Sequence, residues 1–269
     1  MSTVLETARV AITLIFLFYA SWSDYKTREV SNKVWALYAP IAFVLLVSDL
    51  LFFEPSRLLT FGICLGVTVA FSLLLFYSGM FGGADSKALM CIALALPFFP
   101  QASITPIIKE GISPISQNIF PLTILSNAVL FAALIVFGML TWNLYSAKKT
   151  GKPLFAGTLS KEGTGKKILV LLTGYKMPIS KLKEKWHIFP LEDFEKKGEQ
   201  ESRKLVIVPR EEGRETIVQH LSSAVEEGKI ADNVWATPGL PMLIFVTAGL
   251  TIALVVGDVV WLLVSSILG

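Results

Sequence analysis

The chain has 269 residues, a formal net charge of +3 and a hydrophobic fraction of 53%. Its mean hydropathy of +0.62, together with apolar runs too long for core strands, excludes an ordinary soluble globular domain and predicts a polytopic membrane protein. Most of the charge is concentrated in residues 148–236, which hold 17 of the 24 basic and 13 of the 21 acidic residues. Their weak positive excess fits anionic lipid headgroups as well as it fits any other partner, and we expect no nucleic-acid partner.

Six apolar runs follow one another along the chain, and the first is expected to be a retained membrane span and not a cleaved signal. The runs cover residues 4–23, 34–53, 58–79, 88–108, 119–147 and 238–268. Pro97 and Pro100 should bend or end the fourth helix. Asp258 should lie near the end of the sixth span, and we interpret it as structural. The fold class is therefore six transmembrane helices with a small cytoplasmic α+β domain inserted before the last helix.

The expected domains are residues 1–147 with the first five spans, the soluble insert 148–236, and residues 237–269 with the sixth span. Basic residues favour the first, third and fifth connections over the second and fourth, which carry Arg57 and Lys109. The residues that set this bias are Lys26, Arg28, Lys33, Lys87, Lys148, Lys149 and Lys152. By the positive-inside rule the N-terminus is outside and the insert is cytoplasmic, in a multi-pass protein of the cell membrane.

The insert shows short apolar segments typical of strands at residues 167–173, 186–189 and 204–208. Residues 216–227 show helical periodicity and are followed by Gly228 as a stop signal. We therefore expect a small domain with a meandering antiparallel sheet. His187 and His220 stand alone in the sequence, and this favours surface or packing roles over metal binding.

Cys64 and Cys91 each lie inside an apolar run, so we interpret them as small buried hydrophobic residues. The sequence contains no Cys-x-x-Cys pair, which excludes a zinc knuckle of that type and argues against a disulfide framework. No metal and no cofactor is expected.

Between the third and fourth runs, Asp85 follows the small residues Gly82, Gly83 and Ala84. One interpretation is structural, because Asp can accept from backbone N–H groups at the start of the following helix. The other is catalytic, because glycines let backbone or substrate approach the acid.

The predicted topology places Asp24, at the end of the first span, at the same cytoplasmic depth as Asp85. Asp49 and Asp258 fall on the opposite face. Two close carboxylates tend to share a proton, and such a pair can activate water to hydrolyse an amide. The alternative for Asp24 is a solvated acid in the polar hinge 24–33, paired with Lys26 or Arg28.

Residues 22–35 and 81–89 resemble the two active-site regions of the archaeal preflagellin and prepilin peptidases. These membrane aspartyl proteases are related to bacterial type IV prepilin peptidases and share a Gly-x-Gly-Asp-like motif with presenilin. The resemblance extends to the spacing of the acids, the six-span plan and the cytoplasmic insert. It implies that Asp24 and Asp85 form the catalytic dyad. The implied substrates are class III signal peptides of archaellin or pilin precursors, cut on their cytoplasmic side. The resemblance also implies that the motif residues Gly82, Gly83, Ala84 and Lys87 support the site.

Two departures from the family pattern are visible. Ala84 stands at the third motif position in place of glycine, and the absence of a Cys-x-x-Cys pair means that the N-methyltransferase activity of the bacterial enzymes is not expected. Residues 234–241 resemble the start of the family's last span, where Pro238 and Pro241 could keep the backbone extended and pair with substrate. The alternative there is a proline-rich helix start. Glu29 is a candidate for reading the basic leader.

Two other functions use membrane acids in a different way. A proton-coupled transporter would use membrane-embedded acids, but it would place them near the bilayer midplane and favour repeated or broken helices. A relative of signal peptide peptidase would cut within the bilayer and would normally carry a Pro-Ala-Leu motif, which is absent from the sequence.

Overall fold

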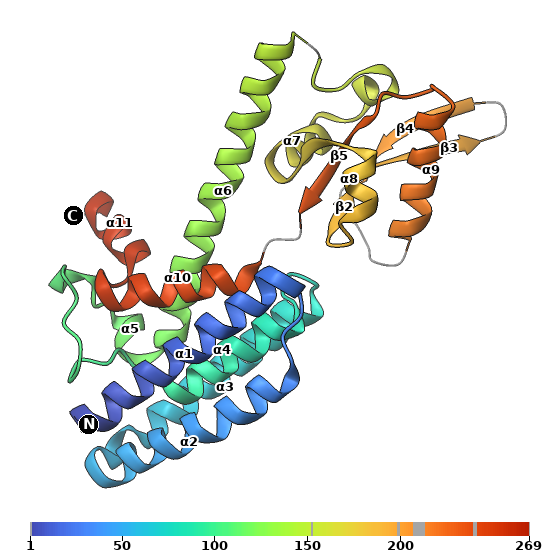
Figure 1. The fold of residues 1–269 in the computed structure, drawn as a ribbon. Helices are drawn as coiled ribbons and strands as arrows, with labels where there is room; N and C mark the ends of the chain where they lie inside the picture. The colour runs from blue at the N-terminus through green and yellow to red at the C-terminus, as the bar shows by residue number, and fades with distance from the viewer. Residues whose placement is uncertain (1, 152, 198–199, 207–212, 239–240, 269) are drawn as a thin grey trace. The chain divides into compact units, whose positions relative to one another are not determined.

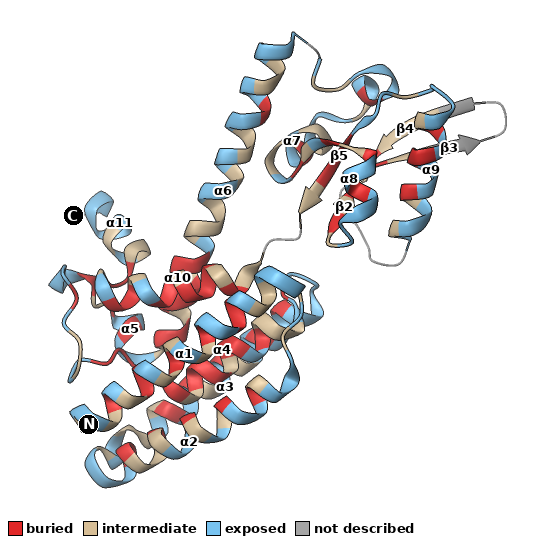
Figure 2. Ribbon diagram, in the orientation of Figure 1, coloured by how far each residue is buried: buried red, intermediate tan, exposed pale blue. Residues whose placement is uncertain are grey.

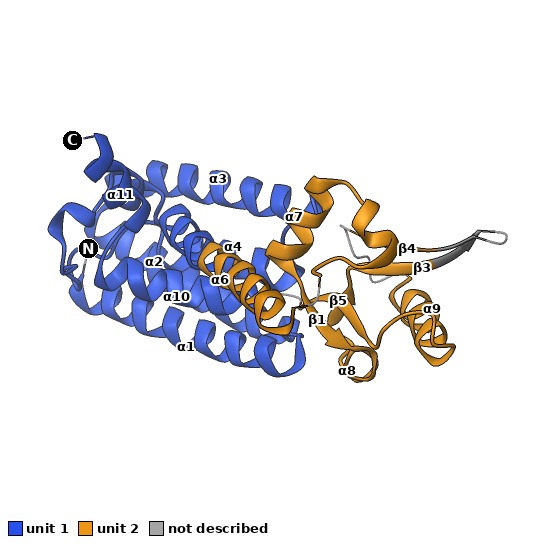
Figure 3. Cartoon of the chain, turned by 90° about the horizontal axis from the view of Figure 1, so that it is seen from above, with its two compact units in different colours: residues 1–132, 241–269 blue, residues 133–240 orange. Residues whose placement is uncertain are grey.

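The computed structural model describes residues 2–151, 153–197, 200–206, 213–238 and 241–268. The chain divides into two compact units, residues 1–132 with 241–269, called unit 1, and residues 133–240, called unit 2 (Figure 3). The unit boundary falls inside a long helix, α6, so unit 2 contains that helix's C-terminal half together with the polar insert.

Unit 1 is helical (Figure 1). Its α-helices are α1 (Thr3–Thr27), α2 (Asn32–Phe53), α3 (Leu58–Tyr77), α4 (Gly83–Ala95), α5 (Pro114–Asn118), the first part of α6 (Phe120–Thr150), α10 (Met242–Val255) and α11 (Val259–Leu268), with the 3-10 turns η1 (Pro55–Arg57) and η2 (Lys109–Gly111). Leu17, Tyr38, Ile92 and Leu250 are fully buried in one core, so α1, α2, α4 and α10 pack together. Figure 2 shows this buried interior and the exposed outer faces.

Within the described residues, four helical segments are long and apolar enough to cross a membrane, namely Thr3–Thr27, Asn32–Phe53, Pro55–Tyr77 and Phe120–Thr150. The pair α10 and α11 would be a fifth if the two count as one span, but they are bent by 60° at the break. The chain is therefore a membrane protein of mostly helical structure, and the expectation of six spans is not confirmed.

Both departures from the six expected runs lie at helix breaks. The fourth run forms a helix only to Ala95, as Pro97 predicted, because a proline lacks the N–H that the helix needs. The sixth run is interrupted before Val259, where Gly257 has a positive φ of 107° and Asp258 accepts from the backbone N–H of Trp261 (3.0 Å). A further correction concerns Asp24, which lies in the last turn of α1 and not in a polar hinge, since the helix continues to Thr27.

The acidic residues set aside by the sequence analysis have structural partners. Asp49 is buried and forms an ion pair with Arg9 (Nη2 to Oδ2, 2.7 Å). Arg9 also donates to the carbonyl of Ala95 at the end of α4 (2.8 Å), so this cation joins α1, α2 and α4. Asp258 accepts from Ser113 (2.7 Å) and is buried, in agreement with its structural interpretation.

Unit 2 combines short helices with two small sheets. Its elements after α6 are η3 (Gly157–Lys161), α7 (Thr164–Thr173), β1 (Tyr175–Pro178), α8 (Ile179–Glu184), β2 (Ile188–Pro190), β3 (Glu192–Lys197), β4 (Gln200–Leu205), α9 (Arg214–Glu226) and β5 (Asn233–Pro238). The first sheet has the order β1-β5-β2 and is antiparallel, while β3 and β4 form a separate hairpin. The expected mixed α+β character of the insert is present.

Several details of the insert differ from the predictions. Residues 167–173 are helical, although a strand was predicted there. The prediction was wrong because a short apolar run has no periodicity that distinguishes a strand from a helix. The sheet is not a meander, since β5, from the end of the insert, lies between β1 and β2. The predicted strands at 186–189 and 204–208 overlap β2 and β4, and residues 207–208 lie outside the described residues. The predicted helix is α9, and Gly228 follows it with a positive φ of 70°.

Candidate active site

Asp24 projects from the last turn of α1 and is half-buried. Its carboxylate lies near the backbone N–H of Leu243, the second residue of α10. That helix begins after Pro241, whose side chain cannot cap it, so its first N–H groups favour a nearby negative charge. The charge of Arg28, the residue that ends α1, also acts on Asp24. The predicted alternative partner Lys26 lies instead over the Trp22 ring, 4.6 Å from its centroid.

Asp85 lies in the first turn of α4 and is also half-buried. Its Oδ2 accepts from the backbone N–H of Gly82 at 3.0 Å, which is the capping geometry that the structural interpretation predicted. The next residue, Ser86, donates to the carbonyl of Ser72 at 3.2 Å and so fixes the start of α4 against α3. A capped carboxylate on a short, well-anchored helix has a defined position.

The structure brings the two acids to the same end of unit 1. Helix α1 contacts α4, and the charges of Asp24 and Asp85 lie close enough to interact. Helix α10 contacts both of these helices. Two acids far apart in the sequence thus lie at one end of the bundle, Asp24 near the N-terminus of α10 and Asp85 at the N-terminus of α4, where it accepts from Gly82. A pair of neighbouring carboxyl groups can hold one proton between them and act as acid and base on a single water molecule.

The small residues before Asp85 differ in their surroundings. A Cβ on Gly82 would lie 3.1 Å from Asp85 Oδ2, so this position has no room for a side chain unless the carboxylate moves. A Cβ on Gly83 would lie 3.7 Å from the Phe76 ring, an ordinary contact. Ala84 already has its methyl group packed against the core of unit 1. The absence of a side chain is therefore required most strongly at Gly82.

Lys87 and Glu29 lie in the surroundings of the acids and are both exposed. The Lys87 ammonium donates to the Asn32 side chain at 2.7 Å, which ties α4 to the first residue of α2. The carbonyl of Glu29 accepts from the hydroxyls of Ser23 (2.7 Å) and Thr27 (3.0 Å), so its backbone is held in place.

The two prolines singled out by the sequence belong to different units. Pro238 ends β5 in unit 2, where it is opposite Ile188 of β2. Residues 233–238 are thus a central strand. The sequence predicted either an extended segment that pairs with substrate or a proline-rich helix start, and neither describes this strand in full. Pro241 precedes α10 in unit 1 and is the residue before its first turn.

Sequence reasoning missed the hydroxyl groups that hold α10 next to Asp24. Ser21 donates to the carbonyl of Leu243 (2.9 Å) and is hydrogen-bonded to Thr247 (2.7 Å), and both hydroxyls are buried. Ser21 precedes Asp24 by three residues, so the two share a helix face. That spacing was the available signal, but nothing in the sequence indicated that α10 was the partner.

No group of three or more metal-binding side chains occurs in the part of the chain that the structure describes. His220 is paired with Asp193 (3.2 Å), and His187 packs its ring edge-on against Trp186. The two cysteines are free and buried.

Two family models match the chain. The model described as the type IV leader peptidase family matches residues 11–138, which include both acids. The model described as Archaeal Peptidase A24 C-terminus Type II matches residues 166–259, which include most of unit 2 and α10. No curated protein matches the chain.

Proposed function

Because the chain belongs to the type IV leader peptidases, a family of membrane-bound aspartic-type enzymes, we propose that it cleaves archaellin or pilin precursors with Asp24 and Asp85 as the catalytic pair. The observation that carries this assignment is the packing of α1 against α4, which brings Asp24 at the end of α1 near Asp85 at the start of α4. The family matches favour a peptidase over the transporter considered above.

In the proposed reaction one acid is ionised and the other is protonated. The ionised carboxylate takes a proton from a water molecule while the water oxygen adds to the carbonyl carbon of the scissile peptide. The protonated carboxyl group gives its proton to the carbonyl oxygen, which forms a neutral tetrahedral diol. The first acid then donates its acquired proton to the leaving nitrogen, the C–N bond breaks, and the diol loses a proton to the second acid.

The surroundings of the two carboxyl groups support their roles as acid and base. Because Oδ2 of Asp85 accepts from Gly82, we assign Oδ1 to the water or substrate. Asp24 lies near the backbone N–H of Leu243, at the start of α10. Backbone donors at helix N-termini stabilise a negative charge, so they hold both acids in place when either one is ionised.

We assign the substrate as a class III signal peptide whose apolar helix enters the bilayer and whose basic leader stays in the cytoplasm. We assign Glu29 to recognition of the basic leader, because this exposed residue lies on the segment that directly follows the helix of Asp24. Pro238 and Pro241 remain candidates for contacts with the extended substrate. Charge reversal with Glu29→Lys should slow the processing of precursors with strongly basic leaders more than those with neutral leaders.

We further propose that the N-terminus is outside and the insert, residues 148–236, is cytoplasmic. The fourth apolar segment begins with the short helix α4. Contacts along α1 nevertheless support the proposal that this segment crosses the membrane. Asp85, at its start, interacts with Asp24 at the end of α1, whereas Ser103 bonds to Glu6 (2.8 Å) and Thr3 (3.1 Å) at the start of α1. The chain from 85 to 103 thus runs the length of α1, as a helix followed by irregular backbone.

The decisive experiment is precursor cleavage by purified protein and by the variants Asp24→Asn and Asp85→Asn. Each change keeps the side-chain shape and removes the titratable group, so each should lower the cleavage rate by at least about 100-fold. Glu110→Gln, which removes an exposed carboxylate from η2, is the matched control and should cleave normally. Because the two acids supply both acid and base, a chelator should leave the rate unchanged.

Folding of each variant is checked by its thermal unfolding midpoint. A folded Asp24→Asn or Asp85→Asn protein that cleaves at the rate of the unmodified chain would disprove the proposed dyad.

A further inference from the structure

Helix α7 of unit 2 has an exposed apolar side. Residues three, four and seven positions apart share one face of a helix, so Gly165, Ile168, Leu169 and Leu172 form one side of α7. Ile168 and Leu169 are 50% and 43% exposed, and Leu172 is half-buried. The opposite side packs into unit 2, where Val170 is buried. The side of α7 that the rest of the chain leaves uncovered therefore consists of glycine, isoleucine and leucine.

The two lysines of α7 lie on the side away from these apolar residues. Lys166 forms an ion pair with Glu162 (Nζ to Oε2, 3.1 Å), and Lys167 donates to the carbonyl of Ser160 (2.5 Å). A surface helix in water normally shows its charged residues to the solvent and its apolar residues to the core. In α7 the exposed side is the apolar one, so this side is suited to an apolar environment.

The C-terminal end of α7 is bonded to α6. Asn143 of α6 is buried, and its side-chain nitrogen donates to the carbonyls of Leu171 (2.9 Å) and Gly174 (2.7 Å). These carbonyls belong to the last turn of α7 and the residue after it, where a helix leaves its acceptors free. The position of α7 is therefore fixed against one particular turn of α6.

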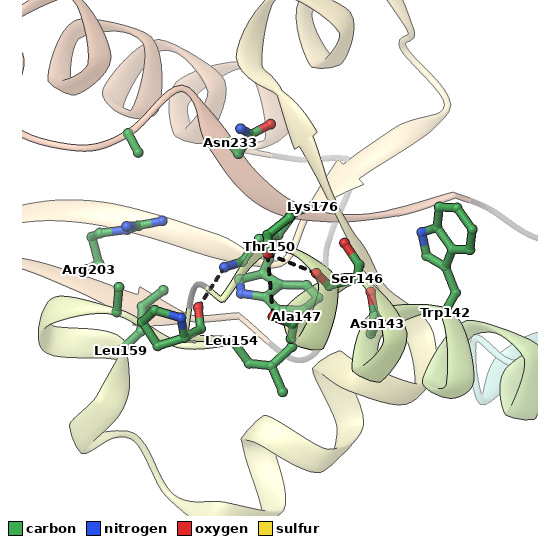
Figure 4. Close-up of a pocket in the computed structure, with 14 residues that line it drawn as sticks. Trp142, Asn143, Ser146, Ala147, Thr150, Leu154, Leu159, Lys176, Arg203 and Asn233 are labelled. Atoms are coloured by element: carbon green, nitrogen blue, oxygen red, sulfur yellow. Dashed lines mark hydrogen bonds between the residues drawn. The ribbon is translucent and has the colours of Figure 1, made fainter.

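The residues around Asn143 indicate the depth of this turn in the membrane. Helix α6 is one of the candidate spans. Trp142 and Tyr145, on either side of Asn143, are 63% and 58% exposed, and Lys148 and Lys149 follow them. Figure 4 shows Trp142 and Asn143 together at this end of α6, beside a pocket of unit 2. Exposed Trp and Tyr followed by lysines are typical of the membrane–water interface. The end of α7 is therefore held at that interface.

Tyr175, which follows α7 after one residue, provides a second contact at this depth. It lines an apolar groove together with residues of α6, namely Leu134, Ile135, Gly138, Met139 and Trp142. These residues lie on the apolar part of the span, before the lysines. The segment from α7 into β1 thus follows α6 down to the level where lipid begins.

We propose that α7 is an interfacial helix that rests on the lipid bilayer, with Ile168, Leu169 and Leu172 in contact with the lipid chains. Helices of this kind lie in the membrane surface with their apolar face at the boundary between headgroups and acyl chains. The partner is lipid and not another protein, because the bonds from Asn143 hold α7 beside the part of α6 that has the interfacial Trp and Tyr. The contact anchors unit 2 to the membrane at a second place besides α6. The proposal requires that α6 crosses the membrane and is independent of the proposed catalytic pair.

The test is spin labelling of the full-length protein in vesicles of an equal mixture of phosphatidylcholine and phosphatidylglycerol. Leu169→Cys places the label on the apolar side of α7, and Lys181→Cys, at an exposed position of α8, is the control. Both native cysteines are buried, so the introduced one is labelled selectively. Collisions of the label with oxygen, which dissolves in lipid, are compared with collisions with a water-soluble nickel chelate. Oxygen should collide more often than nickel at position 169, about 5–10 Å into the boundary of headgroups and acyl chains, and less often at position 181.

A second pair of variants tests whether the apolar side causes this contact. Ile168→Lys, added to the labelled Leu169→Cys chain, should lower the ratio of oxygen to nickel collisions toward the value at position 181, because burying a charge opposes insertion. Ser180→Lys adds the same charge at an exposed position of α8 and should leave the ratio unchanged. Thermal unfolding midpoints check that both variants fold.

Three results would overturn the proposal. Position 169 could show the same collision rates as position 181, which would place α7 in water. The label could be shielded from both reagents, which would mean that protein and not lipid covers α7. Equal effects of Ile168→Lys and Ser180→Lys would show that the apolar side does not hold the helix on the membrane.

Discussion

At Gly82 the space next to the backbone determines where the Asp85 carboxylate can lie. The carboxylate oxygen that accepts from the Gly82 N–H is also the atom that a Cβ on Gly82 would approach to 3.1 Å. Few real Cβ contacts are so short, so a methyl group here would displace the acid by a few tenths of an ångström. The glycine thus allows the cap and sets the position of the acid at the same time.

We predict that Gly82→Ala lowers kcat/KM for precursor cleavage about tenfold, because displacements of this kind between reacting groups are costly. Gly83→Ala is the matched control, since its methyl group makes only an ordinary contact with Phe76 and alanine favours the helix. The test is the kcat/KM of both variants for precursor cleavage, with their thermal unfolding midpoints as the check on folding. Equal kcat/KM values for the two variants would contradict this explanation.

Individual charged residues in unit 1 illustrate how much the sequence reveals at this scale. Asp24 and Asp85 could be selected because the predicted membrane topology assigns them the same depth. The partner of Asp49 could not be selected, because the contact with Arg9 depends on the rotation of α1 against α2. Arg9 is roughly 22 Å from Asp24 along the helix, so this ion pair belongs to the other end of the bundle.

At the scale of elements, close packing of α10 against α6 explains a glycine that the sequence did not single out. A Cβ on Gly249 would lie 2.4 Å from the carbonyl oxygen of Ile124 and 2.9 Å from the backbone nitrogen of Ala128. Both atoms are backbone, so neither can rotate away. The bare Gly249 surface is therefore what lets α10 approach α6.

Gly249→Ala should destabilise the protein by about 1–3 kcal/mol, the usual cost of an overpacked core. Gly66→Ala on α3 is the comparison, because open space surrounds that position, and it should leave the protein unchanged or stabilise it by up to about 1 kcal/mol. Thermal unfolding in detergent measures both. If Gly249→Ala unfolds at the same temperature as Gly66→Ala, the close approach of the two helices is wrong.

The short helix α4 shows which element properties follow from local sequence. Its end before Pro97 was predictable from the missing N–H of proline, while its start was marked by the two glycines and Asp85. Its 13 residues span roughly 20 Å, less than the hydrocarbon core of about 30 Å. In contrast, residues 233–238 form a strand because β1 and β2 lie on either side, and neither partner is near in the sequence.

For the whole molecule, the proposed orientation can be tested with cysteine labelling because both native cysteines are buried. A cysteine introduced at Glu110, in η2, should react on intact cells with a membrane-impermeant maleimide, since this connection is proposed to face outside. One introduced at Lys181, in α8, should react only after lysis. Both positions are exposed.

Labelling of Lys181→Cys on intact cells would reverse the proposed orientation and would place the proposed catalytic pair on the outer face. Labelling of neither variant after lysis would instead show that these positions are covered. The chain without introduced cysteines is the control and should remain unlabelled.

The sequence by itself determined the membrane class, four of the six expected apolar spans, the polar insert, and the choice of Asp24 and Asp85 as the candidate pair. These properties depend on local hydrophobicity, charge and breaker residues, which act over a few helical turns. Only the tertiary structure decided that the start of α10 lies next to Asp24, that β5 is central, and that Arg9 pairs with Asp49. Each of these contacts joins residues that are distant in the sequence, and packing of the whole chain selects one among many possible pairings.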